Sequence, residues 1–197
     1  MEKHLIVSRY TESLEWLNEI DFFDKIFVYN KGPKINNHNE IRLPNVGREA
    51  HTFCYHIARN YNQLGDINIF VQGNPFDHIK NSDSRSLNLF LKYHNYNVEN
   101  SEPLLSDLIV DIPRYTALCY EDCLQGNAPD PILFSPGAQW IVPKKNIASK
   151  SQNFYIRILR NLSQKERSNN TDGVYNAWNL EGMWNYIFNP LTKEKEI

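Results

Sequence analysis

The chain has 197 residues, of which 41% are hydrophobic and 22% are charged. This length suits one domain, and the composition supplies enough apolar side chains for a buried core. The net charge of −2 argues against a general nucleic-acid-binding protein, because phosphate contacts require a basic excess. No apolar run approaches the ~20 residues of a transmembrane segment. Three cysteines, an odd number, favour a reducing compartment, so we expect a cytoplasmic protein.

The first third of the chain alternates predicted strands and helices. Short apolar or β-branched runs predict strands at residues 4–8, 25–30 and 67–71. Thr11 is expected to cap a helix that ends at Ile20. A full apolar stripe predicts a second helix over residues 50–61, after a polar loop at 31–44. This alternation predicts parallel strand–helix–strand units and an α/β layered domain.

The rest of the chain is predicted with less regular spacing. Strands are expected at 108–112 and 139–142, and helices at 84–93, 115–124, 151–162 and 171–188. We therefore predict one domain over residues 1–190. Residues 191–197 form a charged tail.

Three polar segments follow the first three predicted strands, at residues 8–12, 29–32 and 72–78. In an open parallel sheet, ligands bind beyond the carboxyl ends of the strands. These segments carry side chains able to contact phosphate, ribose or a base. The sequence therefore predicts a binding site at this edge of the sheet.

Gly47 and Arg48 open the clearest predicted helix. Free N–H groups, the helix dipole and a guanidinium at one place suit an anion. The alternative is that Asn45 caps the helix, Gly47 eases the turn, and Arg48 and Glu49 are solvated.

Asp77 and His78 form the most unusual pair in the third strand-tip segment. They could hold a divalent cation, or His78 could meet a phosphate, although two adjacent residues alone make a poor chelate. The alternative is a turn at Asn74-Pro75 with both side chains on the surface.

Other common sites are disfavoured by the motifs present. Cys119 and Cys123 lack a second ligand pair for zinc, and Cys54 lies in an apolar helix stripe, so the cysteines are interpreted as small hydrophobic residues. The chain has no nucleophile elbow, P-loop or dinucleotide-binding glycine motif, which disfavours hydrolases, kinase-type NTPases and NAD enzymes.

Glu181 interrupts an aromatic helix that includes Trp178, Trp184 and Phe188. A carboxylate among such neighbours tends to be desolvated, which raises its pKa and makes it a usable general base. The alternative is that Glu181 lies on the polar strip of that helix.

The order of these motifs resembles a nucleotide-sugar glycosyltransferase of the A-type (GT-A) fold. The first strand and its loop match at Val7–Tyr10 with Glu12, and the helix-opening segment matches at residues 45–50. The chain resembles more closely an uncharacterised domain family of fungi, bacteria and large viruses. That resemblance rests on the segments Tyr10…Trp16-Leu17, Gly47-Arg48-Glu49-Ala50, Phe70-Val71-Gln72-Gly73…His78, Ala138-Gln139-Trp140-Ile141-Val142 and Glu181-Gly182-Met183-Trp184-Asn185-Tyr186-Ile187-Phe188.

The resemblance implies an α/β, Rossmann-like GT-A sandwich with a mostly parallel central sheet flanked by helices. It also implies a nucleotide-binding half at residues 1–80 and an acceptor-side half at residues 81–190. It implies transfer of a hexosyl or related group from a nucleotide-diphosphate sugar to a hydroxyl of a glycan or similar acceptor, with Glu181 as the base of an inverting reaction. The remaining roles are donor and nucleotide binding by Ser8, Arg9, Tyr10, Asn30, Arg48, Gln72 and Asn74, and acceptor binding by Gln139, Trp140 and Trp184.

A Mn²⁺ or Mg²⁺ ion held by Asp77 and His78 would complete such a site. This sequence differs from the metal-dependent members of the family at this place, because it has Gln72-Gly73-Asn74 where they carry Asp-x-Asp. A metal-independent mechanism therefore stays open, as does a non-catalytic nucleotide-sugar or glycan-binding module. A nuclease-like enzyme using His78 with Asp77 is disfavoured by the near-neutral charge. The sequence leaves the oligomeric state open.

Overall fold

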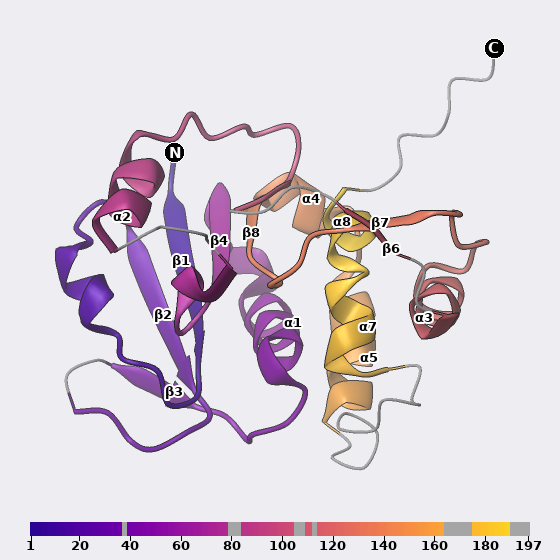
Figure 1. Ribbon diagram of the computed structural model, residues 1–197, viewed down its shortest axis with the longest axis horizontal. Helices are drawn as coiled ribbons and strands as arrows, with labels where there is room; N and C mark the ends of the chain where they lie inside the picture. The colour runs from indigo at the N-terminus through magenta and orange to yellow at the C-terminus, as the bar shows by residue number, and fades with distance from the viewer. Residues whose placement is uncertain (37–38, 79–83, 105–108, 112–113, 164–174, 190–197) are drawn as a thin grey trace.

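The computed structural model describes residues 1–36, 39–78, 84–104, 109–111, 114–163 and 175–189. Within these ranges the chain is an α/β fold with a six-stranded sheet, a two-stranded sheet and seven α-helices (Figure 1). The strands are β1 (Lys3–Arg9), β2 (Lys25–Asn30), β3 (Glu40–Arg42), β4 (Ile67–Gln72), β5 (Glu102–Pro103), β6 (Ile109–Asp111), β7 (Ile132–Phe134) and β8 (Trp140–Pro143). The helices are α1 (Arg48–Asn60), α2 (Ser84–Tyr93), α3 (Arg114–Leu124), α4 (Lys144–Ala148), α5 (Gln152–Leu162), α7 (Ala177–Glu181) and α8 (Trp184–Phe188), with 3₁₀ turns η1 (Glu15–Glu19), η2 (Tyr61–Gln63) and η3 (Pro75–His78).

The main sheet has the strand order β3-β2-β1-β4-β8-β5. The four strands β3, β2, β1 and β4 are mutually parallel, as the alternation of strands and helices predicts. Strands β8 and β5 are each paired antiparallel. The sheet is therefore mixed, which corrects the expectation of a mostly parallel one. The physical reason is that β8 does not complete a strand–helix–strand unit with β4, the unit in which a parallel pair is expected. The chain passes through α2, β5, β6, α3 and β7 between these two strands.

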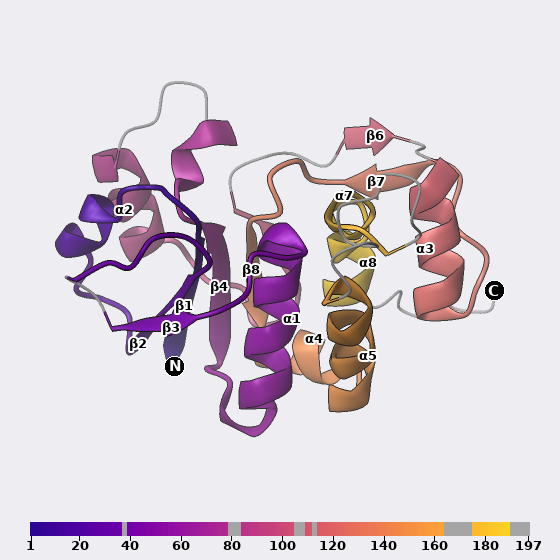
Figure 2. The ribbon, with the colours of Figure 1, turned by 90° about the horizontal axis from the view of Figure 1, so that it is seen from below.

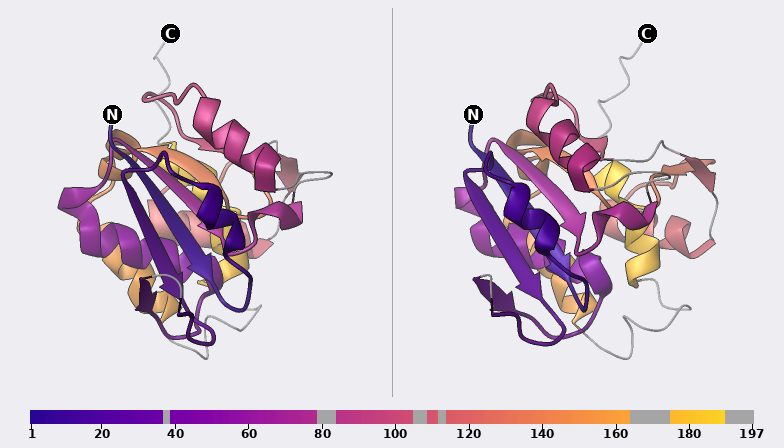
Figure 3. Two further views of the ribbon diagram at one scale, coloured as in Figure 1. Left: turned by 90° about the vertical axis from the view of Figure 1, so that its left-hand side faces the viewer. Right: turned by 60° about the vertical axis from the view of Figure 1, so that its left-hand side comes forward.

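Strand β1 is buried on both of its faces, as a continuous apolar run predicts. Ile6 belongs to one hydrophobic cluster, and its neighbours Leu5 and Val7 belong to the other. The layer with α1 covers the Ile6 face, whereas η1 and α2 cover the opposite face (Figures 1 and 3). The central strands thus lie in the middle layer of a three-layer arrangement.

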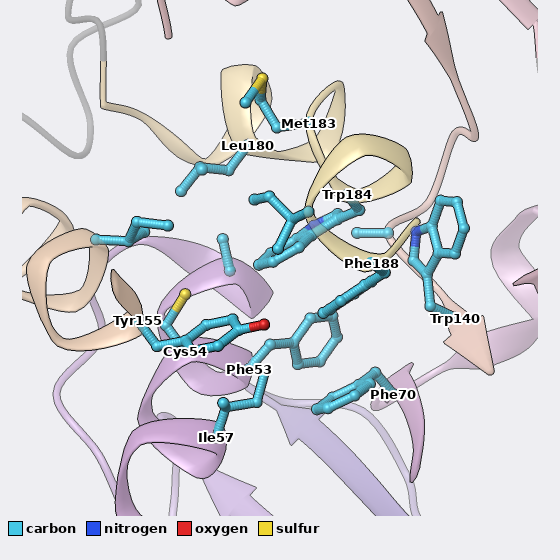
Figure 4. Packing of buried hydrophobic residues seen from close by; sticks show 14 of the residues in the cluster. Phe53, Cys54, Ile57, Phe70, Trp140, Tyr155, Leu180, Met183, Trp184 and Phe188 are labelled. Atoms are coloured by element: carbon cyan, nitrogen blue, oxygen red, sulfur yellow. The ribbon is translucent and has the colours of Figure 1, made fainter. Parts of the chain in front are cut away.

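The larger cluster lies between the sheet and helices α1, α5, α7 and α8. Phe70 of β4 packs against Phe53 of α1 with ring centroids 5.0 Å apart, and it stacks on Phe188 of α8 at 5.7 Å (Figure 4). Residues from Ile6 to Phe188 belong to this one cluster, so it joins both predicted halves of the chain. Figure 2 shows α3, β6 and β7 on the far side of α7 and α8 from the main sheet.

Most predicted elements are present, and three differ in form. Thr11 does not begin an α-helix, because only the short turn η1 forms at residues 15–19, where Trp16 and Leu17 are buried. Glu40–Arg42, inside the expected loop, pairs with β2 as β3. The helix expected at 171–188 consists of α7 and α8, separated at Gly182, and residues 171–174 lie outside the described ranges.

Additional elements are β5, β7 and α4, which have too few residues to show a sequence period. No helix in the described ranges is both long and apolar enough to span a membrane. The expected charged tail at 191–197 falls outside the part of the chain that the structure describes.

Candidate functional site

A polar cleft of about 320 Å³ lies where β1, β2 and β4 end and α1 begins. Strand β1 lies between β2 and β4, and the chain runs outward to β2 and β3 before α1 returns it to β4. This reversal of strand order is the place where open α/β sheets bind ligands. The cleft is lined by three basic residues, four acidic or amide residues, a serine and a tyrosine, namely Ser8, Arg9, Tyr10, Glu12, Lys31, Asn45, Arg48, Glu49 and Gln72.

The start of α1 has an unusual backbone. Gly47 has φ 58° and Arg48 has φ 45°, so two successive residues adopt the left-handed region. A Cβ at position 47 would also lie 2.9 Å from Cβ of His51, so glycine fits there for two reasons. A non-glycine residue in this conformation costs of order 1–2 kcal/mol, and such strain is concentrated at functional sites. This turn places Arg48 on the wall of the cleft.

Lys31, directly after β2, holds this turn. Its Nζ donates a hydrogen bond of 2.8 Å to the carbonyl oxygen of Val46 and another to the carbonyl oxygen of Arg48. The side chain is only 8% exposed. Burial lowers the pKa of Lys31 to about 7, against an opposing effect of the Glu49 charge. The cleft therefore contains an amine that titrates near neutral pH.

Glu49 is the second buried charge of the cleft. Its burial corrects the alternative in which Glu49 is solvated. It is 8% exposed, and burial raises the pKa of its carboxyl group. This rise in the pKa of Glu49 is opposed by its own backbone N–H and by the charges of Arg48 and Lys31. The negative charge of Glu181 adds to the rise. Glu181 is the last residue of α7, which packs against α1. Its Oε1 accepts a hydrogen bond of 2.6 Å from the backbone N–H of Gly137.

Arg9 and Asn30 brace the loops beneath the cleft. Nη1 of Arg9 donates to Oδ1 of Asn30 at 2.9 Å, and the guanidinium also bonds to the carbonyl oxygens of Tyr10, Glu12 and Pro33.

Asn30 is fully buried, and its amide oxygen also accepts from the N–H of Gly32. Its Nδ2 donates to Pro33 and to the Glu40 carboxylate. These bonds use both acceptor sites and both donors of the amide. The structure thus corrects the predicted base contact, because Asn30 has no group left for a ligand.

The other predicted donor-binding residues lie in or beside the cleft. Ser8, Tyr10 and Gln72 line it, with Tyr10 49% exposed. Oγ of Ser8 donates to Oγ1 of Thr52 at 2.8 Å, which ties β1 to α1. Oδ1 of Asn74 accepts from the N–H of Phe76, the short-range bond expected of a turn at Asn74-Pro75.

Glu12 brings a carboxylate to the tip of β4. Its Oε2 accepts a hydrogen bond of 2.6 Å from the N–H of Tyr10. A Cβ at Gly73 would lie 2.6 Å from that same oxygen, so glycine gives Glu12 the room to approach. The loops after β1 and β4 therefore meet at Glu12 and Gly73.

The expected metal ligands Asp77 and His78 lie on the turn η3, and their side chains are outside what the structure describes. Among the residues it does describe, no three His, Cys, Asp or Glu side chains gather as a metal site. Cys54, Cys119 and Cys123 are buried free thiols, as predicted.

The three expected acceptor residues are buried. Trp140 and Trp184 have no exposed surface, and both pack in the aromatic core around Phe188 (Figure 4). Gln139 is 3% exposed, and its Nε2 donates to the carbonyl oxygen of Pro75. This corrects their predicted role, because a buried ring cannot stack on a sugar. The aromatic residues belong to the inward face of their elements, which a motif position does not reveal.

Sequence reasoning missed Lys31, Glu49 and Trp178 as site residues. The guanidinium carbon of Arg48 lies 4.4 Å from the ring centroid of Trp178, which is 58% exposed. The only feature of the sequence that could have pointed to Lys31 is its position in the polar segment after the second predicted strand. Glu49 lies on the inward stripe of α1, one residue before Ala50, and its burial follows from that position.

Comparisons with known proteins add one result. Nothing matches among curated proteins or solved structures. The match to a protein family covers residues 5–107, just over half of the chain. It includes most of β1, all of β2 and β4, and every lining residue of the cleft. The chain therefore belongs to the family described as protein of unknown function DUF3431.

Proposed function

We propose that this protein is a glycosyltransferase that moves a sugar from a nucleotide-diphosphate donor to an acceptor hydroxyl on a glycan or a similar molecule. The observation that carries the proposal is the polar cleft at the point where the strand order reverses. Parallel strands connected in this order form nucleotide-binding sites beyond their carboxyl ends. We propose further that the mixed sheet is a GT-A-type arrangement.

The donor diphosphate fits the wall of the cleft at the start of α1. Arg48 and Lys31 bring two positive charges there, next to the first N–H groups of a 13-residue helix. Arg9 contributes a third charge, although its Nε and Nη1 are already bonded to loop atoms. These groups would stabilise the negative charge that develops on the leaving nucleoside diphosphate.

Glu181 is the proposed general base, which takes the proton from the acceptor hydroxyl as the new glycosidic bond forms. Glu181 lies on α7, which packs against α1, and its charge contributes to the raised pKa of Glu49 in the cleft. Burial raises the pKa of Glu49, which makes this residue the second candidate for the base.

Calorimetry with UDP, GDP, CDP and ADP, each with and without Mn²⁺, tests the donor site. At least one nucleotide should bind, and Arg48→Ala should weaken binding about tenfold through loss of a charge-assisted contact. Arg59→Ala is the matched control, because Arg59 is exposed on the last turn of the same helix. If no nucleotide binds, both the transferase and a nucleotide-sugar-binding module are excluded.

Glu181→Gln tests the base. Nucleoside diphosphate release from the matching nucleotide sugar should fall by roughly 10²–10⁴-fold while donor binding persists. Glu121→Gln, an exposed glutamate on α3, is the control. Unchanged turnover in Glu181→Gln combined with loss in Glu49→Gln would transfer the role to Glu49.

One observation favours a non-catalytic nucleotide-sugar or glycan-binding module as the second candidate. Amides and a glycine, Gln72-Gly73-Asn74, occupy the tip of β4 where metal-dependent glycosyltransferases carry carboxylates. Nucleotide binding without any donor hydrolysis or transfer would select this module. For either function we propose a cytoplasmic location, with which three buried free thiols are compatible.

A further inference from the structure

We propose that Trp178 is the acceptor-binding surface of the cleft, on which a pyranose ring stacks against the indole face opposite Arg48. The inference rests on the proposed function and names a residue and a ligand class for its acceptor side. It replaces Trp140 and Trp184, which are buried.

Exposure distinguishes Trp178 from the other tryptophans. Trp178 is 58% exposed, whereas Trp16, Trp140 and Trp184 are 6% exposed or less. The chain has four tryptophans, so this is the single one that a ligand can reach. An indole ring left in water does not contribute the favourable free energy of burying its apolar surface. A ligand that covers the ring would bury that surface and contribute this free energy to binding.

Arg48 fixes the position of the ring. Its guanidinium carbon lies 4.4 Å from the ring centroid, close enough for a cation–π contact. One face of the indole is thereby covered, so the exposed surface of Trp178 belongs mainly to the opposite face and the ring edges. Because Arg48 also lines the cleft, Trp178 contacts a residue of the cleft wall.

Glu181 supplies a polar group on the helix that carries Trp178. It follows Trp178 by three residues in α7, a spacing that places two side chains on one face of a helix. Its charge reaches Glu49 of the cleft. An aromatic face flanked by carboxylates matches a sugar, whose ring C–H groups pack on the indole while its hydroxyls donate to the carboxylates.

The surroundings of Trp178 favour a sugar over a protein partner. Arg48 contacts the ring and pairs with Glu49 at 3.8 Å, and Glu181 follows Trp178 by three residues on α7. A protein interface usually has a contiguous apolar centre, which a single indole among charges does not provide.

Fluorine NMR of the full chain labelled with 5-fluorotryptophan tests the inference, with one signal expected for each of the four tryptophans. Trp178→Phe assigns the signal of Trp178. The probes are methyl β-glycosides of glucose, galactose, mannose, xylose and N-acetylglucosamine at millimolar concentrations, added with and without UDP or GDP. At least one probe should shift the Trp178 signal. The dissociation constant of that probe, measured by calorimetry, should be about fivefold to tenfold higher for Trp178→Ala than for the wild type. Tyr93→Ala, which removes an exposed aromatic ring on α2, should leave that constant unchanged.

The result separates this inference from the proposed function. If a nucleotide binds and no probe shifts the Trp178 signal, the stacking surface is wrong while the donor site stands. An equal dissociation constant in wild type and Trp178→Ala overturns the inference as well. If no nucleotide binds and a probe still shifts the Trp178 signal, the stacking surface is supported and the transferase is excluded.

Discussion

The ammonium group of Lys31 donates a hydrogen bond of 2.8 Å to the carbonyl oxygen of Val46 and a second bond to the carbonyl oxygen of Arg48. This contact joins the end of β2 to the left-handed turn that opens α1. The left-handed turn also holds Arg48 over the ring of Trp178. One buried lysine therefore links the sheet to the cleft wall, and its protonation state affects the stability of the whole connection.

Replacing Lys31 by Met should change how stability depends on pH. Burial lowers the pKa of Lys31 from 10.5 to about 7 in the folded chain, so the unfolded chain binds more protons between these values. The free energy of unfolding of the wild type should therefore rise with pH in this window relative to Lys31→Met, by at most about 1.4 kcal/mol per pH unit. Urea unfolding of both proteins at several pH values measures the difference.

Other titrating groups lie near Lys31, namely Glu49, His51 and Cys54 of α1. They are present in both the wild type and Lys31→Met, so their titration contributes to both stability curves. Lys34→Met is the control, since Lys34 is exposed on the same loop. Parallel stability curves for wild type and Lys31→Met would show that the lysine keeps its ordinary pKa when folded.

Replacing Asn30 by Ala should destabilise the fold and not act selectively on ligand binding. The amide bonds to Arg9, Gly32, Pro33 and Glu40, and its loss leaves buried partners unsatisfied, at a cost of about 2–3 kcal/mol. Urea denaturation measures this loss, with Asn62→Ala on the exposed turn η2 as control. Normal stability with lost nucleotide binding would restore the interpretation of Asn30 as a base contact.

The parallel half of the sheet could be predicted because its strands carry strong local signals. The strand predicted at 25–30 is β2 itself, and the stripe on α1 marks its inward face correctly. The antiparallel part could not be predicted in the same way. Strands β5 and β7 have two and three residues, and the direction of β8 depends on the path of the chain before it.

The location of the site could also be predicted, but the roles of its side chains could not. Strand tips follow from topology, and Ser8, Tyr10, Arg48 and Gln72 line the cleft as expected. Whether a polar side chain faces a ligand or its own loop depends on hydrogen bonds between distant segments. Asn30 illustrates this, because its partners Arg9 and Glu40 come from β1 and β3.

Replacing Trp184 by Ala should cost about 3–5 kcal/mol of stability, because the ring is fully buried and stacks on Phe188 at 5.0 Å. Trp178→Ala should cost about 1 kcal/mol or less, since it removes an exposed ring and one cation–π contact. Thermal or urea unfolding of the two variants measures the contrast. Equal losses would contradict the difference in burial on which the acceptor surface depends.

Replacing Gly32 by Ala should destabilise the protein severely, because a Cβ at this position would lie 1.6 Å from the carbonyl oxygen of Tyr10. That oxygen also accepts a hydrogen bond from Arg9, so it cannot move without disturbing the brace beneath the cleft. We expect a loss of about 3 kcal/mol or more, as for other changes that force a backbone shift in a packed region. Gly126→Ala is the matched control, since no atom lies within 4 Å of its added Cβ. Urea unfolding distinguishes them, and a Gly32→Ala variant as stable as Gly126→Ala would mean that the loops after β1 and β2 do not meet as closely as described.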